Sequence, residues 1–331
     1  MAAIEDDTLL DERSTADQTL LDEQRRRTPA AVAAISAGLL TMGGGAVAAL
    51  VYSDLPSVPV LDALRERFAA GDPSPGLKAL QVRWYDDNAL KLLLVAIVLA
   101  LAAAAIGVAL THLYRSVKAR RPQLPHYVVY AAVAGAVLVA VSGIVQAIAV
   151  AMEASSFAQS SNQSSDGARD VLAGPVIVAS LLLRQVGVFA LGFAFVLLAL
   201  NAMRVGLLTR FMGVLGIIVG VLFIIPIGSS LPIVQAFWLT SLGVLFLGRW
   251  PSGMPPAWVT GEAQPWPTQQ ELREARIEAQ AEKAASTEDE DEERPRRMGR
   301  RERAEAPETP APELPARRPH PSSKKRKRKR R

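Results

Sequence analysis

Four polar side chains interrupt the long apolar stretches of this chain, and they are the groups there that can contact a solute. They are Gln146, Arg184, Gln185 and Gln235. A guanidinium and amides can hydrogen-bond an anion or a small neutral solute, so the four are candidate pore contacts. Arg184 has two interpretations. It is either a structural arginine that bonds neighbouring glutamines or extends to the polar edge of the apolar layer, or a contact for an anionic ligand.

Groups that would support catalysis or metal binding are missing from the same stretches. No Asp or Glu lies inside them, which argues against a proton-coupled carrier or an ion pump, because their proton relays use intramembrane carboxylates. The chain has no cysteine, so disulfides and thiolate metal sites are excluded. His112 and His126 have no further His, Cys or acid nearby in the sequence that would complete a metal site. We therefore expect no metal, no cofactor and no enzymatic activity.

Six apolar stretches must position these residues. The first four reach the length of about 20 apolar residues with which a helix crosses about 30 Å of hydrocarbon, and the last two are shorter. Helices are expected because every backbone polar group in lipid must be bonded within its own segment. The fold class is therefore all-α, a polytopic membrane protein with a six-helix transmembrane bundle and disordered cytoplasmic tails. The predicted spans within a transmembrane domain at 30–249 are about residues 30–52, 89–114, 127–152, 176–200, 211–227 and 231–248.

The distribution of Lys and Arg between the spans predicts the orientation of the chain. Connections rich in these residues alternate with poorer ones, and Lys and Arg in short loops are retained on the cytoplasmic side. Both termini are therefore expected in the cytoplasm. A composition rich in Ala, Val, Leu and Arg is typical of a bacterial source, so the expected location is a bacterial cytoplasmic membrane. The basic connections contain Arg25, Arg26, Arg27, Arg115, Lys118, Arg120, Arg121, Arg204, Arg210 and Arg249.

Two tails flank the predicted transmembrane domain. Residues 1–29 form an acidic leader that contains an imperfect repeat, Thr8–Glu12 and Thr19–Glu23, at a period of 11 residues. Eleven residues are three helical turns, so the two Leu pairs of the repeat would share one helix face. The leader is either a soluble, partly helical segment or a docking site.

Residues 250–331 combine three segments of different composition. A Pro/Trp segment comes first, and its tryptophans are candidate anchors at the level of the lipid headgroups. A charged helix is expected from about Gln269 to Ala285, and the chain beyond Thr287 is too polar to fold. The last eight residues, Lys324 to Arg331, are all basic. We expect them to bind anionic lipid headgroups, and we do not favour nucleic acid as their partner.

Small residues recur at helical spacing within the spans. Gly216 and Gly220 form a GxxxG pair, and a stripe in the third span comprises Ala132, Ala136, Ala140, Gly143, Ala147 and Ala151. Lipid gives no hydrophobic drive between helices, so such stripes let backbones approach closely. They serve either packing within one bundle or the assembly of a homo-oligomer.

The stretch from Asn201 to Gly216, a basic loop that leads into a Gly-rich span, resembles uncharacterised multi-spanning membrane proteins of actinobacteria. Leu247 to Pro251, Pro255 to Trp258 and Pro265 to Pro267 are similar to theirs too, and the similarity covers about residues 24–276. The resemblance implies a six-span helical protein in a bacterial cytoplasmic membrane. It carries over no catalytic or binding residue.

Two functional classes remain. The sequence favours a non-enzymatic interaction or scaffold component whose cytoplasmic tails recruit partners or anionic lipid. The alternative is a permease or channel for a small neutral or anionic solute, with the four polar side chains as pore contacts. An inverted repeat of spans would favour the permease, but the halves have no convincing similarity. A cavity that reaches Arg184 would also favour it.

Overall fold

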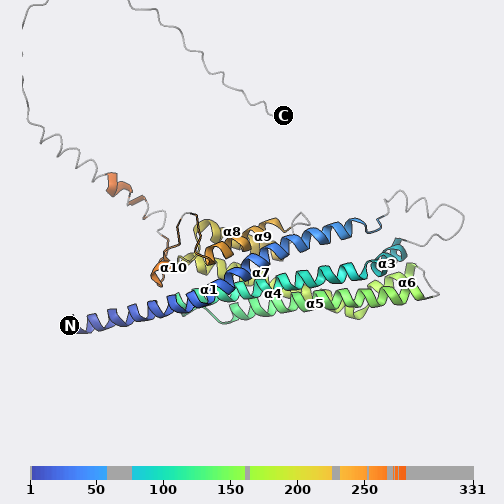
Figure 1. Ribbon diagram of the computed structural model, residues 1–331, viewed down its shortest axis with the longest axis horizontal. Helices are drawn as coiled ribbons and strands as arrows, with labels where there is room; N and C mark the ends of the chain where they lie inside the picture. The colour runs from blue at the N-terminus through green and yellow to red at the C-terminus, as the bar shows by residue number, and fades with distance from the viewer. Residues whose placement is uncertain are drawn as a thin grey trace, which may run out of the picture. The chain divides into compact units, whose positions relative to one another are not determined.

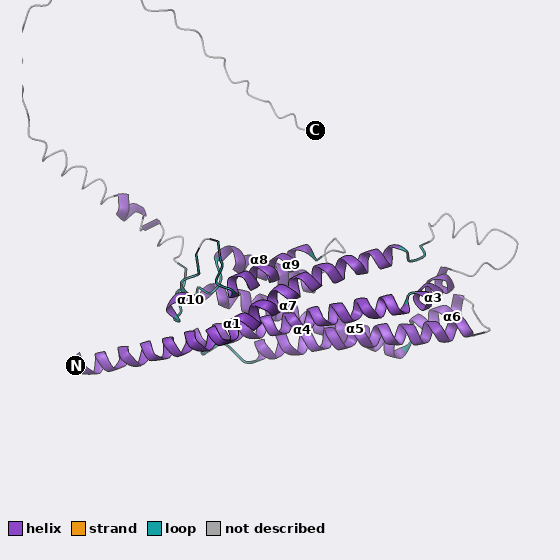
Figure 2. Cartoon of the chain, viewed as in Figure 1, coloured by secondary structure: helices purple, strands orange, loops and turns teal. Residues whose placement is uncertain are grey.

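The computed structural model of the chain describes residues 2–57, 77–160, 165–225, 232–251, 253–266, 271, 273–274 and 276–280. Side chains are described from residue 16 onward, except at 165 and 166. Within these residues all regular secondary structure is helical (Figure 2). The predicted turn around residues 226–231 and the basic tail Lys324–Arg331 lie outside the described residues.

The first four predicted apolar stretches lie within helices, and the described residues of the last two are mostly helical. Four of these helices are long and apolar enough to cross a membrane, which is compatible with a multi-pass membrane protein. Helices α8 and α9 have 15 and 14 residues, or only about 21 to 23 Å at the helical rise. The long helices are α1 (Ala2–Ser53), α4 (Ala89–Arg120), α5 (Tyr127–Gln159) and α7 (Pro175–Arg204), and the short ones are α8 (Arg210–Ile224) and α9 (Ile233–Phe246).

The acidic leader and the first predicted span form one helix. Helix α1 continues from Ala2 through Pro29 to Ser53 without a break, so the predicted domain boundary at residues 29 and 30 is not a structural break. Proline removes one backbone donor from a helix, and α1 accommodates this loss. Because the leader belongs to α1, its position relative to the bundle is set by the packing of that helix.

The six apolar helices pack as a ring in the order α9, α1, α4, α5, α7, α8, and α7 also contacts α4. The largest fully buried side chains include Phe195 of α7 and Trp238 of α9, whose ring centroids lie 5.3 Å apart. The buried Trp238 Nε1 donates a hydrogen bond of 2.9 Å to the Met212 carbonyl of α8. This bond satisfies the indole N–H and joins the two short helices.

Small residues bring the helices of this ring into close contact. A methyl group at Gly220 of α8 would lie 2.7 Å from the Gly192 carbonyl oxygen of α7, and one at Gly216 would lie 2.7 Å from the Ala199 Cβ. The predicted GxxxG pair therefore packs α8 on α7 within the chain. Helices α1 and α9 meet in the same way, because a methyl group at Gly243 would lie 3.0 Å from the Ala31 carbonyl oxygen.

The basic connections gather at one end of the bundle, the arginine-rich end. Here the guanidinium of Arg121, the residue after α4, donates to the Asn201 side-chain oxygen of α7 at 2.8 Å. Arg27 of α1 donates to the carbonyl of Phe246 of α9. These long-range bonds show that connections distant in the sequence share one end of the fold, as their alternation predicts.

The Pro/Trp segment folds onto this end. Trp258, in α10 (Ala257–Thr260), donates to the Leu207 carbonyl at 2.8 Å, and Trp266 donates to the Leu208 carbonyl at 2.8 Å. The Gln264 amide donates to the Val205 carbonyl at 3.1 Å. Trp258 is buried. Both indoles therefore fix the loop between α7 and α8 through their N–H groups.

Two short helices that the sequence analysis did not predict form the opposite end of the bundle, the α3–α6 end (Figure 1). They are α3 (Leu77–Asp87) and α6 (Ser165–Leu172). Each packs on the other and on α5. Their shared apolar cluster consists of Ala79, Val82, Ala154, Phe157 and Ala168.

Residues 269–331 form a separate unit. The described residues between 271 and 280 are helical and exposed. This agrees with the charged helix predicted from about Gln269 to Ala285.

Candidate functional site

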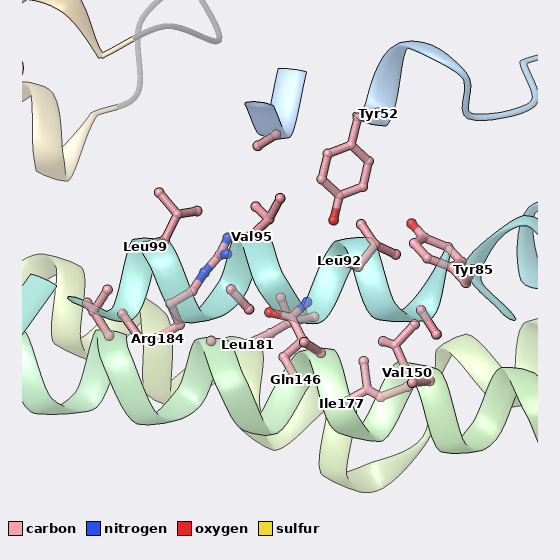
Figure 3. A pocket seen from close by; sticks show the side chains of 18 of the residues that line it. Tyr52, Tyr85, Leu92, Val95, Leu99, Gln146, Val150, Ile177, Leu181 and Arg184 are labelled. Carbon is pink, nitrogen blue, oxygen red and sulfur yellow. The ribbon is translucent and has the colours of Figure 1, made fainter. Parts of the chain in front are cut away.

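A cavity of about 390 Å³ lies among α1, α4, α5 and α7 towards the α3–α6 end. Its walls are mostly aliphatic, and α3 and α6 each add one residue, Tyr85 and Leu172. Cavities of this size and apolar character are typical of small-molecule sites. Figure 3 shows the labelled side chains of Tyr52 on α1, Leu92 and Val95 on α4 and Arg184 on α7 around the same space.

Two of the four predicted polar side chains line this cavity. Arg184 comes from α7 and Gln146 from α5 (Figure 3). Arg184 is the one formally charged residue among the described residues that line the cavity. Neither side chain hydrogen-bonds another residue within the described part of the chain, so both have unused donors. The cavity thus presents a guanidinium and an amide on an otherwise apolar wall.

The other two predicted pore contacts lie elsewhere. Gln185 follows Arg184 on α7, and both side chains are exposed, whereas Gln235 is half-buried on α9. Neither glutamine lines the cavity. Successive residues of a helix point about 100° apart, so Arg184 and Gln185 cannot share one narrow face. The structure therefore groups Arg184 with Gln146 and not with the two remaining glutamines.

An aromatic cluster lies beside the cavity. The Tyr52 and Trp84 ring centroids are 5.9 Å apart, and those of Trp84 and Tyr85 are 5.3 Å apart. Burial raises the pKa of the Tyr85 phenol above its usual value, and the neighbouring Tyr52 raises it further. Tyr85 therefore stays protonated at neutral pH and can donate a hydrogen bond. The sequence analysis did not connect Tyr52 or Tyr85 with Arg184.

Small residues create the space of the cavity. Gly143, Ala147 and Ala151 of α5 line it, and a methyl group at Gly143 would have no heavy atom within 4 Å. The first half of the same stripe behaves differently, because Ala132 and Ala136 are buried in the core. Ala132 and Ala136 therefore have the predicted packing role within the bundle, whereas Gly143 borders the cavity.

The arrangement supports binding more readily than catalysis. A guanidinium holds an anionic oxygen through charge-assisted hydrogen bonds, and the aliphatic walls suit an apolar body. Among the described residues no group of three or more His, Asp or Glu could hold a metal ion. The site is thus suited to a small ligand that combines an acidic group with an apolar part.

Comparison of the chain with protein-family models, with curated proteins and with solved structures gives no match.

Proposed function

We propose that this chain is a multi-pass protein of a bacterial cytoplasmic membrane and acts as a permease or channel for a small anionic solute. The observation that supports this proposal is the cavity of about 390 Å³ that Arg184 and Gln146 enter from two helices. In apolar surroundings an arginine without a carboxylate partner costs about 2.5 to 3.5 kcal/mol to insert. A bound anion would offset part of that cost.

The proposed topology has six spans, with α8 and α9 as the fifth and sixth and both termini in the cytoplasm. The positive-inside distribution of Lys and Arg supports it. In this orientation the arginine-rich end faces the cytoplasm, and the cavity lies in the half of the membrane nearer the outside. A solute would enter the cavity from the α3–α6 end.

Cysteine labelling tests this topology, because the chain has no cysteine of its own. In intact cells a membrane-impermeant maleimide should label Asp87→Cys and Ser230→Cys, whereas Ala119→Cys should react only after the cells are permeabilised. Labelling of Ala119→Cys in intact cells would show that the orientation is the reverse of the proposed one. If Ser230→Cys were not labelled in intact cells, the chain would have four spans.

The ligand site is tested with octanoate, an amphiphilic anion, and with octanamide as its uncharged counterpart. Octanoate should raise the thermal stability of the purified full chain and should enter proteoliposomes that contain it faster than protein-free liposomes. Octanamide, which crosses lipid unaided, should not raise the thermal stability and should enter both kinds of vesicle equally fast. Arg184→Leu should weaken octanoate binding by about tenfold or more, because a charge-assisted hydrogen bond is worth about 1.5 to 3 kcal/mol.

Two glycines provide a matched steric test of the same site. Gly143→Leu should abolish octanoate binding and uptake, because the added side chain fills the cavity. Gly43→Leu on α1 is the control, since a methyl group there also has no heavy atom within 4 Å and Gly43 does not line the cavity. Equal octanoate binding by the wild type, Gly143→Leu and Arg184→Leu would contradict the proposal.

The second candidate function is the interaction or scaffold component. It is supported by α1, whose acidic leader exposes Leu21 at 59% on the same helix as the first span. An exposed leucine on a charged helix can contact a partner protein. Leu21→Asp distinguishes the candidates, because it should remove a partner captured in the cytoplasm and leave octanoate uptake unchanged.

A further inference from the structure

A groove and a pocket lie at the arginine-rich end, at the opposite end of the bundle from Arg184. An apolar groove of about 510 Å³ runs between α4 and α5, and a polar pocket of about 390 Å³ adjoins it beside α1 and α4. Arg26, His112 and Arg115 line both. The groove has aliphatic walls, the pocket has polar walls, and two exposed arginines lie between them. This arrangement suits an amphiphile, which has an apolar part and a polar part.

The groove itself has the character of a binding site for an acyl chain. It is lined by Ala104, Gly107 and Val108 of α4 and by Val133, Val137 and Val141 of α5. Three of these valines are about half exposed, at 52% for Val108 and 54% for Val137 and Val141. In the proposed topology this groove faces the inner leaflet, where a lipid tail would cover the valines.

The polar pocket contains buried atoms without partners. His112 is 6% exposed and Ser116 is 1% exposed. Within the described part of the chain, His112 Nε2 and Ser116 Oγ have no hydrogen-bond partner. Unsatisfied buried polar atoms cost about 1 to 3 kcal/mol each, and a phosphodiester with its ester and phosphoryl oxygens can accept a bond from the serine hydroxyl.

The charges around the pocket favour an anion. Glu23 lines it but is held by Arg120 in an ion pair, and Asp22 is the other carboxylate in its wall. The formal charges of these two acids and of three arginines, Arg26, Arg115 and Arg120, add up to one positive charge. Arg26 and Arg115 are exposed, and neither forms an ion pair with a described residue.

We propose that the groove and pocket hold one glycerophospholipid of the inner leaflet with a singly charged anionic headgroup. Its phosphodiester lies between Arg26 and Arg115, its headgroup alcohol enters the polar pocket, and one acyl chain follows the groove. Phosphatidylglycerol has this chemistry. The site rests on the proposed membrane topology, but it shares no residue with the Arg184 cavity.

The experiment measures lipid binding to the full chain in a neutral detergent by native mass spectrometry. The probes are phosphatidylglycerol, phosphatidylethanolamine and phosphatidylcholine with identical acyl chains. We expect saturable binding of one phosphatidylglycerol, and at least about tenfold weaker binding of the other two lipids. The double variant Arg26→Gln/Arg115→Gln should lose that preference. Arg204→Gln, which removes an exposed arginine outside the two pockets, should keep it.

Two single substitutions that add a bulky side chain test the same proposal if the double variant does not fold. Val137→Trp should block the groove and weaken phosphatidylglycerol binding by about tenfold or more, whereas Val214→Trp, at an exposed valine of α8, should not. Equal binding of the three lipids, or unchanged phosphatidylglycerol binding in Val137→Trp, would overturn the proposal. Because octanoate binding is measured at Arg184, failure of one site leaves the other result intact.

Discussion

Glu23→Ala is expected to lower the free energy of unfolding by about 3 kcal/mol or more, because it leaves a buried arginine without its counterion. The Arg120 side chain is 0% exposed. Its Nη1 and Nη2 both donate to the Glu23 carboxylate, the second at 3.0 Å. Its Nη2 also donates to the Ala257 carbonyl at 2.6 Å. Thermal unfolding of the full chain in detergent measures the effect.

A double-mutant cycle separates the contribution of the Glu23–Arg120 ion pair to stability from the effect of losing other contacts of the Glu23 side chain. Arg120→Met removes the buried charge and leaves Glu23 at an edge where water can reach it, so Glu23→Ala/Arg120→Met should be more stable than Glu23→Ala alone. Asp17→Ala is the matched control, since Asp17 is an exposed acid on the same helix. An unchanged unfolding temperature for Glu23→Ala would show that the pair contributes nothing.

Trp258→Ala is expected to lower the free energy of unfolding by about 3 to 5 kcal/mol, the range for removing a large buried aromatic side chain. The Trp258 ring packs against Phe246, with centroids 5.9 Å apart, and the Arg120 guanidinium lies 5.6 Å from the ring centroid. The substitution also leaves the Leu207 carbonyl without its donor. Thermal unfolding again provides the measurement.

Two further substitutions divide this effect into its parts. Trp258→Phe keeps most of the ring volume but loses the hydrogen bond to the Leu207 carbonyl. It should therefore lower the free energy of unfolding by about 1 to 3 kcal/mol. Val259→Ala, at a position that is 65% exposed, should be nearly neutral. If Trp258→Ala were as stable as Val259→Ala, the Pro/Trp segment would not be part of the folded bundle.

The lengths of the apolar stretches and the Lys and Arg residues between them predicted much of the fold, because each signal depends on a single segment of the chain. A helix within lipid must satisfy its own backbone, so α4, α5 and α7 lie where the sequence indicated. Gly216 and Gly220 indicated a close contact of α8 with another helix, but they left open whether that helix belongs to the same chain or to another copy. Whether α8 and α9 cross the membrane depends on more than their apolar length.

The candidate sites were only partly predictable, because they depend on which helices become neighbours. Arg184 and Gln146 were identified as polar residues in apolar surroundings, but nothing in their spacing indicated that α5 and α7 would bring them to one cavity. Gly143 belongs to a stripe whose other half packs, so sequence alone could not show that it borders a space. Trp258 was missed as a structural residue because its partner, Leu207, lies 51 residues away.

The contact between α1 and α9 joins the first of the six apolar helices to the last of them. Until residues 233–246 have been synthesised, the face of α1 around Ala31 and Ile35, against which Gly243 packs, lacks this partner. The ring therefore closes only after α9 is complete, and every nascent chain that ends before α9 has an open α1 face. Chains that stop after α8 would expose that face permanently, which makes them natural targets for membrane quality-control proteases and for unwanted pairing between copies.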